Sequence, residues 1–130
     1  MKPIALAAIV ALTGGTAIAG PQHDAIIAGY AARAASALDA ERGRALFLAS
    51  HPGGKPDTPS CTTCHTADPA ATGQTRAGKP IEPMAVSHSP ERFTDPEKLE
   101  KWFGRNCGSV LGRECTAMEK GDILLWLNSL

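Results

Sequence analysis

The stretch that decides the fold is Cys61-Thr62-Thr63-Cys64-His65, which lies near the middle of a chain of 130 residues. Two thiols separated by two residues and followed directly by an imidazole are the attachment signature of a haem c. We therefore predict that Cys61 and Cys64 form the thioether bonds to the porphyrin and that His65 is the proximal ligand of the iron. The alternative is a thioredoxin-like dithiol, which would need a βαβ pattern around it and would leave His65 without a role.

Residues 1–19 have the features of a secretory signal peptide. A lysine precedes the apolar run of residues 4–12, which is too short to span a bilayer, and Ala17-Ile18-Ala19 is a small-x-small cleavage site. A retained membrane anchor is the alternative, and the cleavage site argues against it. We expect a single domain over residues 20–130 and a periplasmic location, where haem is attached and disulfides persist.

The composition is balanced in charge and poor in aromatic residues. The chain contains 13 basic and 13 acidic residues, and 5% of its residues are aromatic. A near-neutral protein offers no electrostatic basis for binding nucleic acid or an anionic membrane surface, and we expect no membrane span in the mature protein. A domain of this size with few aromatic side chains buries only a small core of its own. A covalently bound porphyrin would supply the missing apolar volume, so the haem is predicted to be part of the core.

Helical periodicity and capping signals predict four helices and no strands, so we expect an all-α fold wrapped around one haem c. A leading helix over residues 24–37 occupies most of the extension 20–38. The second helix runs from Ala40 to about Ser50, with Asp39 as its N-cap. Gly43 on its apolar face would allow close approach by another helix, although a merely tolerated glycine is the alternative.

The two remaining helices lie in the second half of the chain. Asp95 is predicted to cap the third helix, with Pro96 at its first helical position. Thr116 and Glu119 form a capping box that begins the last helix, which continues to about Asn128.

The third helix carries Leu99, Trp102, Phe103 and Asn106 at positions i, i+3, i+4 and i+7, which places them on one face. Trp102 and Phe103, the bulkiest members, are predicted to line the haem pocket. A carboxamide at the end of an apolar stripe faces the interior and must find a partner. From the pattern alone we favour a C-cap role for Asn106 at the end of this helix over coordination of the iron.

Cys107 and Cys115 remain once the other two cysteines hold the haem. In an oxidising compartment this pair is predicted to form a disulfide, and two unpaired thiols are the alternative. The loop between the two residues contains Gly108 and Gly112, which favour tight turning. Because Cys107 directly follows Asn106, the bridge would fix the helix end predicted there.

The sixth ligand decides between a closed, low-spin electron carrier and an iron with an open position for a small molecule. Met84, in the irregular segment 66–90, is a candidate thioether ligand, with packing as the alternative. For the other candidates we expect structural roles and no bond to the iron. His51 and His88 are predicted to be solvated loop residues, Met118 to pack in the core or lie on the surface, and His23 to belong to a disordered mature N-terminus. The pattern of residues alone leaves the sixth ligand open.

Several stretches of the chain resemble the SHP-type cytochromes c, which are class I cytochromes. They are residues 41–48, 53–65, 73–76 and 92–95 and, most specifically, Gly104-Arg105-Asn106-Cys107 followed by Cys115-Thr116. The resemblance implies a class I cytochrome c domain over residues 20–130, in which two haem-wrapping helices cross at small residues that would be Gly43 and Gly121. It also implies that Asn106 is the distal iron ligand and that Cys107 and Cys115 form a disulfide beside it.

The same resemblance implies a function. A carboxamide oxygen is a hard, weak donor that suits ferric iron better than ferrous iron, so reduction would release Asn106 and let oxygen or nitric oxide bind. The expected electron donors are a dihaem cytochrome c and a membrane cytochrome b. Two alternatives are a low-spin electron carrier with Met84 as the sixth ligand and an enzyme that reduces oxygen or peroxide. For the enzyme, no distal His/Arg pair of the peroxidase kind is evident in the sequence.

Overall fold

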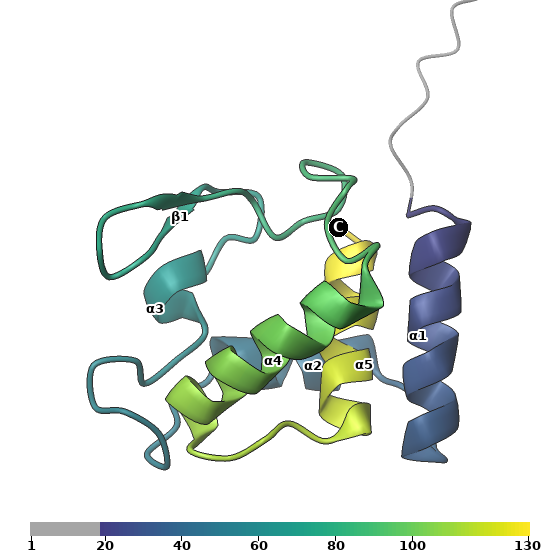
Figure 1. The fold of residues 1–130 in the computed structure, drawn as a ribbon, viewed down its shortest axis with the longest axis horizontal. Helices are drawn as coiled ribbons and strands as arrows, with labels where there is room; N and C mark the ends of the chain where they lie inside the picture. Colours follow the sequence, from purple (N-terminus) through teal and green to yellow (C-terminus); the bar gives the residue numbers. More distant parts are fainter. Residues whose placement is uncertain (1–18) are drawn as a thin grey trace, which may run out of the picture.

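The computed structural model describes residues 19–130, so the predicted signal peptide lies outside the described residues except for Ala19. In this range the chain forms five helices and one short hairpin, so the fold is mainly α-helical (Figure 1). The helices are α1 (Pro21–Ala34), α2 (Ala40–Leu48), α3 (Thr62–His65), α4 (Pro96–Leu111) and α5 (Ala117–Asn128). The strands are β1 (Gly73–Gln74) and β2 (Pro80–Ile81).

Side-chain caps begin three of the helices at the predicted residues. Asp39 accepts hydrogen bonds from two backbone N–H groups in the first turn of α2, at 2.8 and 3.0 Å, and Asp95 does the same for α4. Thr116 and Glu119 cap α5 reciprocally, as expected of a capping box. These bonds satisfy backbone donors that have no partner within the helix, and they confirm the predicted starts of α2, α4 and α5.

The leading helix α1 lies one turn earlier in the chain than predicted, from Pro21 to Ala34. His23 in its first turn is buried, with 4% of its surface exposed. Its Nδ1 accepts a hydrogen bond from the Gly20 N–H at 3.0 Å, and its Nε2 lies 2.8 Å from the carbonyl of Arg92. The prediction of a disordered His23 is therefore wrong, because a residue far along the chain supplies its partner.

The helix α4 continues past Asn106 to Leu111. The predicted helix end at Asn106 is wrong, and Asn106 is not a C-cap. Local propensity favoured a stop there, but Cys107 and Val110 are buried and extend the apolar face of the helix into the core. The helix ends where Gly112 adopts a left-handed φ of 72°.

A short hairpin in the segment after the Cys-x-x-Cys-His stretch was not predicted. Its strands β1 and β2 pair antiparallel, with Gly73 opposite Ile81. β1 packs so closely on α3 that a Cβ atom at Gly73 would collide with the backbone carbonyl of Cys64. The rest of the segment is irregular, as predicted, and it passes over the top of the molecule in Figure 1.

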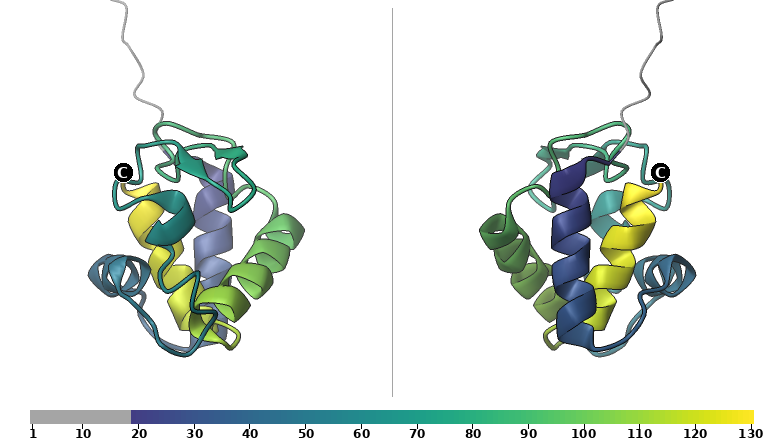
Figure 2. Two further views of the ribbon diagram at one scale, coloured as in Figure 1. Left: turned by 90° about the vertical axis from the view of Figure 1, so that its left-hand side faces the viewer. Right: turned by 90° about the vertical axis from the view of Figure 1, so that its right-hand side faces the viewer.

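The last helix, α5, lies between α1 and α2 (Figure 2). α2 and α5 approach closely at Gly43, where an added Cβ atom would collide with the carbonyl of Asp122 and the amide of Ile123. Gly121 does not take part in this crossing, contrary to the expectation, and faces Leu38 and Tyr30 instead. The absence of a side chain at Gly43 therefore sets the separation of the two helices.

Two clusters of buried side chains fill the space between the helices. The first consists of Phe47, Met84, Ile123, Trp126 and Leu127, and the second of Tyr30, Leu99 and Leu124. Phe93 and Phe103 pack against both clusters and thereby join them. Between residues 19 and 130, no helix combines the length and the apolar character that crossing a membrane requires.

Candidate haem site

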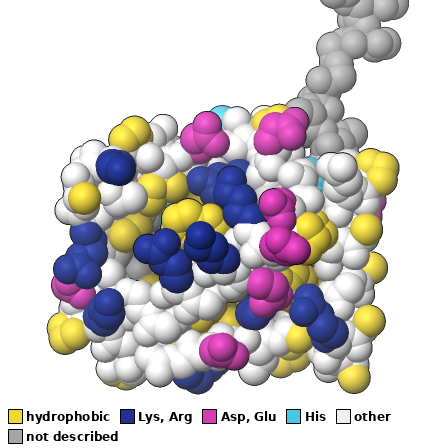
Figure 3. All heavy atoms as spheres, viewed as in Figure 1, with side chains coloured by type: hydrophobic (Ala, Val, Ile, Leu, Met, Phe, Trp, Pro, Cys, Tyr) yellow, Lys and Arg dark blue, Asp and Glu magenta, His cyan; other side chains and the backbone are white. Residues whose placement is uncertain are grey.

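A cavity of about 980 Å³ is lined by residues of α2, α3, α4 and α5 and by the loops on either side of α3. Figure 3 shows a hollow with hydrophobic side chains at its floor and Lys and Arg side chains around it. The cavity is lined by all the residues predicted to hold the haem, which are Cys61, Cys64, His65, Trp102, Phe103 and Asn106. The fold therefore brings together side chains from two separate parts of the sequence.

The geometry at Cys61 and Cys64 fits the attachment of a haem c. Both cysteines are free, half-buried and part of the cavity wall. A hydrogen bond of 3.1 Å from the His65 N–H to the Cys61 carbonyl closes a single helical turn, so the thiols and the imidazole project from one turn. Burial raises the pKa of the Cys61 thiol to about 11, which keeps it protonated at neutral pH.

His65 presents a neutral and unpaired imidazole. Its Nδ1 atom is buried and has no hydrogen-bond partner in the part of the chain that the structure describes. Burial, with a smaller contribution from the positive charge of Arg92, lowers the pKa of His65 to about 4. Neutral imidazole is the form that binds a metal. A large apolar cavity, two free thiols and this imidazole together fit a covalently attached haem.

Asn106 lies in the wall of the cavity and belongs to α4, several residues before the helix ends at Leu111. The next residue, Cys107, forms the predicted disulfide with Cys115, with Cα atoms 5.7 Å apart. The bridge ties the second half of α4 to the loop that precedes α5. The main chain of Asn106 is therefore held firmly, whereas its carboxamide makes no hydrogen bond to any residue between 19 and 130.

A second restraint on α4 comes from residues 53–58, which we call the strap. The carbonyl of Ser109 accepts hydrogen bonds from the Lys55 N–H at 2.7 Å and from the Thr58 hydroxyl at 3.1 Å. Carbonyl groups in the last turn of a helix have no partner within it, so the strap supplies the missing donors. Because the strap leads directly to Cys61, it connects the haem-attachment residues with α4.

Trp102 and Phe103 line the cavity on the side of α4. Phe103 packs against the core clusters, whereas Trp102 is 46% exposed and has the guanidinium of Arg105 5.1 Å from the centre of its ring. Arg92 is a half-buried cation in the cavity wall that the sequence did not single out. A single arginine in a loop has no periodic sequence pattern. The one signal for Arg92 in the sequence is that the stretch 92–95 resembles a known family.

Three of the other candidate ligands of the iron line the cavity but have other contacts, whereas Met118 and His23 are not part of its wall. Met84 is buried and belongs to the first core cluster. His51 is half-buried rather than solvated, because its Nε2 lies 2.9 Å from the Leu46 carbonyl. His88 is exposed, as predicted, and its Nδ1 lies 3.0 Å from the hydroxyl of the neighbouring serine. These contacts favour structural roles for all three residues.

Comparisons with known proteins find close relatives. A family model described as a domain of unknown function, DUF1924, matches residues 33–127. The cytochrome c-type protein SHP of Cereibacter sphaeroides is 60% identical over 118 residues, which cover 90% of this chain and 92% of that protein. Cytochrome c'' of Methylophilus methylotrophus is 38% identical over 69 residues, which cover 52% of this chain and 48% of that protein.

Solved structures have the same fold. The structure of oxidised SHP, an oxygen-binding cytochrome c, has a TM-score of 0.81 at 60% identity and covers 83% of this chain and 96% of its own. The crystal structure of oxidised cytochrome c'' from Methylophilus methylotrophus has a TM-score of 0.66 at 28% identity, with coverage of 82% and 92%. These likenesses confirm the predicted all-α fold around one covalent haem c.

Proposed function

The chain belongs to the SHP family of c-type cytochromes and carries one covalently attached haem c, and on this basis we propose that it transfers electrons in the periplasm and binds a small diatomic gas under the control of Asn106. Haem c supplies a one-electron couple and, where the sixth ligand of the iron is weak, a site for oxygen or nitric oxide. The relative SHP is an oxygen-binding cytochrome c, and its high identity to this chain supports gas binding here.

The observation that carries the proposal is the position of Asn106. Its side chain is exposed on the wall of the cavity that also contains His65, and its carboxamide oxygen accepts no hydrogen bond from any residue between 19 and 130. A carboxamide oxygen is a hard donor that matches ferric iron better than ferrous iron. We therefore infer that Asn106 is the sixth ligand in the oxidised protein and that its side chain leaves the iron on reduction.

The surroundings of Asn106 keep a released side chain near the site. The main chain at this position belongs to α4 and is adjacent to the disulfide between Cys107 and Cys115, so release requires only a side-chain rotation. The carboxamide NH₂ group can then donate a hydrogen bond to a diatomic ligand. Trp102 and Phe103 on the same wall restrict the access of larger ligands.

The proposed electron donors are a dihaem cytochrome c and a membrane cytochrome b, as the family resemblance implies. The secretory signal expected at residues 1–19 supports a periplasmic location. Mixing the oxidised protein with a reduced, purified dihaem cytochrome c in a stopped-flow spectrometer tests the first donor. We expect rapid reduction of the haem, and failure to transfer electrons would exclude this partner.

Substituting Asn106→Val tests the proposal against the alternative in which Met84 is the sixth ligand. Valine has no donor atom, so the ferric iron should become five-coordinate or water-ligated, and azide should bind faster. The matched control Met84→Leu should retain the ferric absorption and electron paramagnetic resonance spectra of the wild type, since Met84 packs in the core. Carbon monoxide should shift the spectrum of the reduced wild type. An unchanged Asn106→Val spectrum together with a changed Met84→Leu spectrum would contradict the proposal.

A further inference from the structure

We propose that Arg92 binds a propionate group of the haem and that His23 of α1 positions Arg92 for this role. Five cations line the cavity, and Arg92 is the half-buried one. The others are Lys55, Arg76, Lys98 and Arg105, which are exposed. Arg92 is therefore the cation whose charge is least screened by water and acts most strongly within the cavity.

The guanidinium of Arg92 has a donor that lacks an acceptor. Its Nε–H is buried, and no acceptor among residues 19–130 lies within hydrogen-bond distance. Its Nη2 donates to the backbone carbonyl of Glu82 at 3.0 Å. A buried charged donor without a partner is costly, and native proteins rarely leave one without a ligand. Because a guanidinium binds a carboxylate through two parallel hydrogen bonds, a haem propionate is the group that fits.

No carboxylate of the described chain takes the place of this ligand. Glu82, Glu91 and Asp95 line the cavity, but none of them forms an ion pair with Arg92. Arg76, by contrast, is already paired with Asp57 at 2.6 Å. Burial lowers the pKa of Arg92, and the negative charge of Glu82 offsets this effect only in part. The missing negative charge is therefore expected from the bound group.

His23 holds the main chain of Arg92. Because the Nδ1 of His23 accepts a hydrogen bond from the Gly20 N–H, its Nε2 carries the ring proton and donates to the Arg92 carbonyl at 2.8 Å. The Arg92 N–H donates in turn to the Ser89 carbonyl at 3.0 Å. The backbone groups on both sides of Arg92 are thus fixed, and one of the two bonds is made by α1.

Phe93 fixes the direction of the chain immediately after Arg92. It adopts a left-handed φ of 62°, which is unfavourable for a bulky residue and persists only where the surroundings enforce it. Its side chain packs against both core clusters. Phe93 is held by the core clusters, and the Arg92 carbonyl is bound to His23. The side chain of Arg92 then lies in the cavity wall. The leading helix α1 therefore contributes to the haem site without touching it.

Arg92→Gln in the haem-containing protein tests the binding role. A nearby cation favours the reduced, less positive iron, so its removal should shift the reduction potential downward, and the propionate bending band in the resonance Raman spectrum should move. Arg92→Lys keeps the charge and should keep most of the potential. The control Lys101→Gln removes an exposed cation of α4 that is not in the cavity wall, and it should change neither measurement. Unchanged potential and Raman band in Arg92→Gln would overturn the assignment of Arg92.

A pair of substitutions at His23 tests the positioning role. His23→Leu loses the hydrogen bond to the Arg92 carbonyl and should shift the potential and the Raman band in the same direction as Arg92→Gln, but less. His23→Gln can still donate to that carbonyl and should restore both. Wild-type values for His23→Leu would overturn the role of His23, and this pair remains decisive for the proposal if Arg92→Gln fails to fold. The propionate band reports the contact with Arg92 directly and does not depend on whether Asn106 binds the iron, so it separates these tests from the test of gas binding.

Discussion

The hydroxyl oxygen of Thr58 lies 2.8 Å from the hydroxyl oxygen of Ser109 and 3.1 Å from the Ser109 carbonyl oxygen. Thr58 belongs to the strap that leads to Cys61, and Ser109 lies one helical turn beyond Asn106 on α4. The segment that attaches the haem and the helix that carries its proposed distal ligand are therefore joined by partly buried hydrogen bonds. This contact links the part of α4 that carries Asn106 to the segment that leads to the attachment residues.

Thr58→Val should loosen this connection. Valine keeps the branched shape but removes the hydroxyl, so the Ser109 carbonyl retains only the Lys55 N–H as a donor. Loss of such a bond costs about 1 kcal/mol, and we expect azide to bind the ferric protein about 2- to 10-fold faster, because Asn106 is held less firmly. Stopped-flow absorption measures the rate. Thr58→Ser should restore the wild-type rate, and equal rates for all three proteins would show that the strap does not control Asn106.

Removing the disulfide with Cys107→Ser and Cys115→Ser should destabilise the protein while leaving the haem attached. The bridge joins residues that are eight positions apart, and closing so small a ring stabilises a protein by about 2–3 kcal/mol on the chain-entropy model. Denaturant unfolding measures the loss, and mass spectrometry of the denatured protein measures the attached haem. A Cys61→Ser control should keep the disulfide and lose one thioether bond. A stability equal to that of the wild type would argue that the bridge restrains nothing.

The parts of the fold that local chemistry determines could be predicted from the sequence. The caps at Asp39, Asp95 and Thr116 lie where they were predicted because a cap needs only its own residue and the next turn. The disulfide followed from the cysteine count and the compartment. The end of α4 was misplaced, because the buried side chains of Cys107 and Val110 outweigh the local preference for a stop.

Contacts between distant residues could not be predicted in this way. The bond between His23 and Arg92 spans 69 positions, and the bond between Thr58 and Ser109 spans 51. No sequence motif that contains one residue of either pair identifies the other residue as its partner. The haem-attachment residues are adjacent in sequence, so their motif is recognisable from the sequence alone. The contacts that hold Arg92 and α4 join residues that come together only in the folded chain.

Gly43→Ala should separate α2 from α5. The added methyl group would meet the backbone of Asp122 and Ile123, which cannot move without shifting the helix. Overpacking of this kind costs about 1–3 kcal/mol. The control Gly29→Ala adds the same group to α1 at a position with no neighbouring atom within 4 Å, and it should stabilise the protein by about 0.5–1 kcal/mol. Urea unfolding measures both changes, and a Gly43→Ala protein as stable as the wild type would contradict the close crossing.

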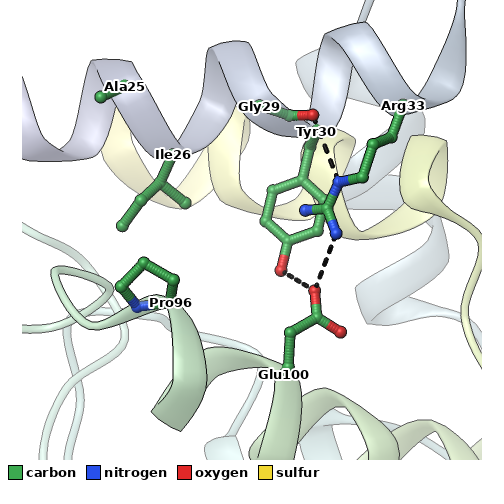
Figure 4. Close-up of a pocket in the computed structure, with 7 residues that line it drawn as sticks. All are labelled: Ala25, Ile26, Gly29, Tyr30, Arg33, Pro96 and Glu100. Carbon is green, nitrogen blue, oxygen red and sulfur yellow. Dashed lines mark hydrogen bonds and ion pairs between the residues drawn. The ribbon is translucent and has the colours of Figure 1, made fainter.

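Glu100 on α4 joins α1 and α5 to that helix through three hydrogen bonds. It accepts from the Tyr30 hydroxyl at 2.7 Å, from Lys120 Nζ at 2.6 Å and from Arg33 at 3.5 Å. Figure 4 shows Tyr30 and Arg33 converging on the Glu100 carboxylate beside a cleft of about 320 Å³ between α1 and α4. The hydrogen bond from Lys120 and then that from Tyr30 lower the pKa of Glu100. Burial and the Glu100 carboxylate raise the pKa of Tyr30, so this hydroxyl stays protonated and continues to donate.

Glu100→Gln should therefore make the stability of the protein less dependent on pH in the acid range. A carboxyl whose pKa is lower in the folded state stabilises the protein above its unfolded pKa of about 4.3, and this contribution disappears as the pH falls through the folded value. Because Glu100 is 42% exposed, solvent screening limits the effect to about 1 kcal/mol at pH 7. Denaturant unfolding at pH 7 and pH 3 measures it, with Glu97→Gln, an exposed residue of the same helix, as the control. The difference in stability between the wild type and Glu100→Gln should be larger at pH 7 than at pH 3. A difference of the same size at both values would show that the charge of Glu100 does not link the helices.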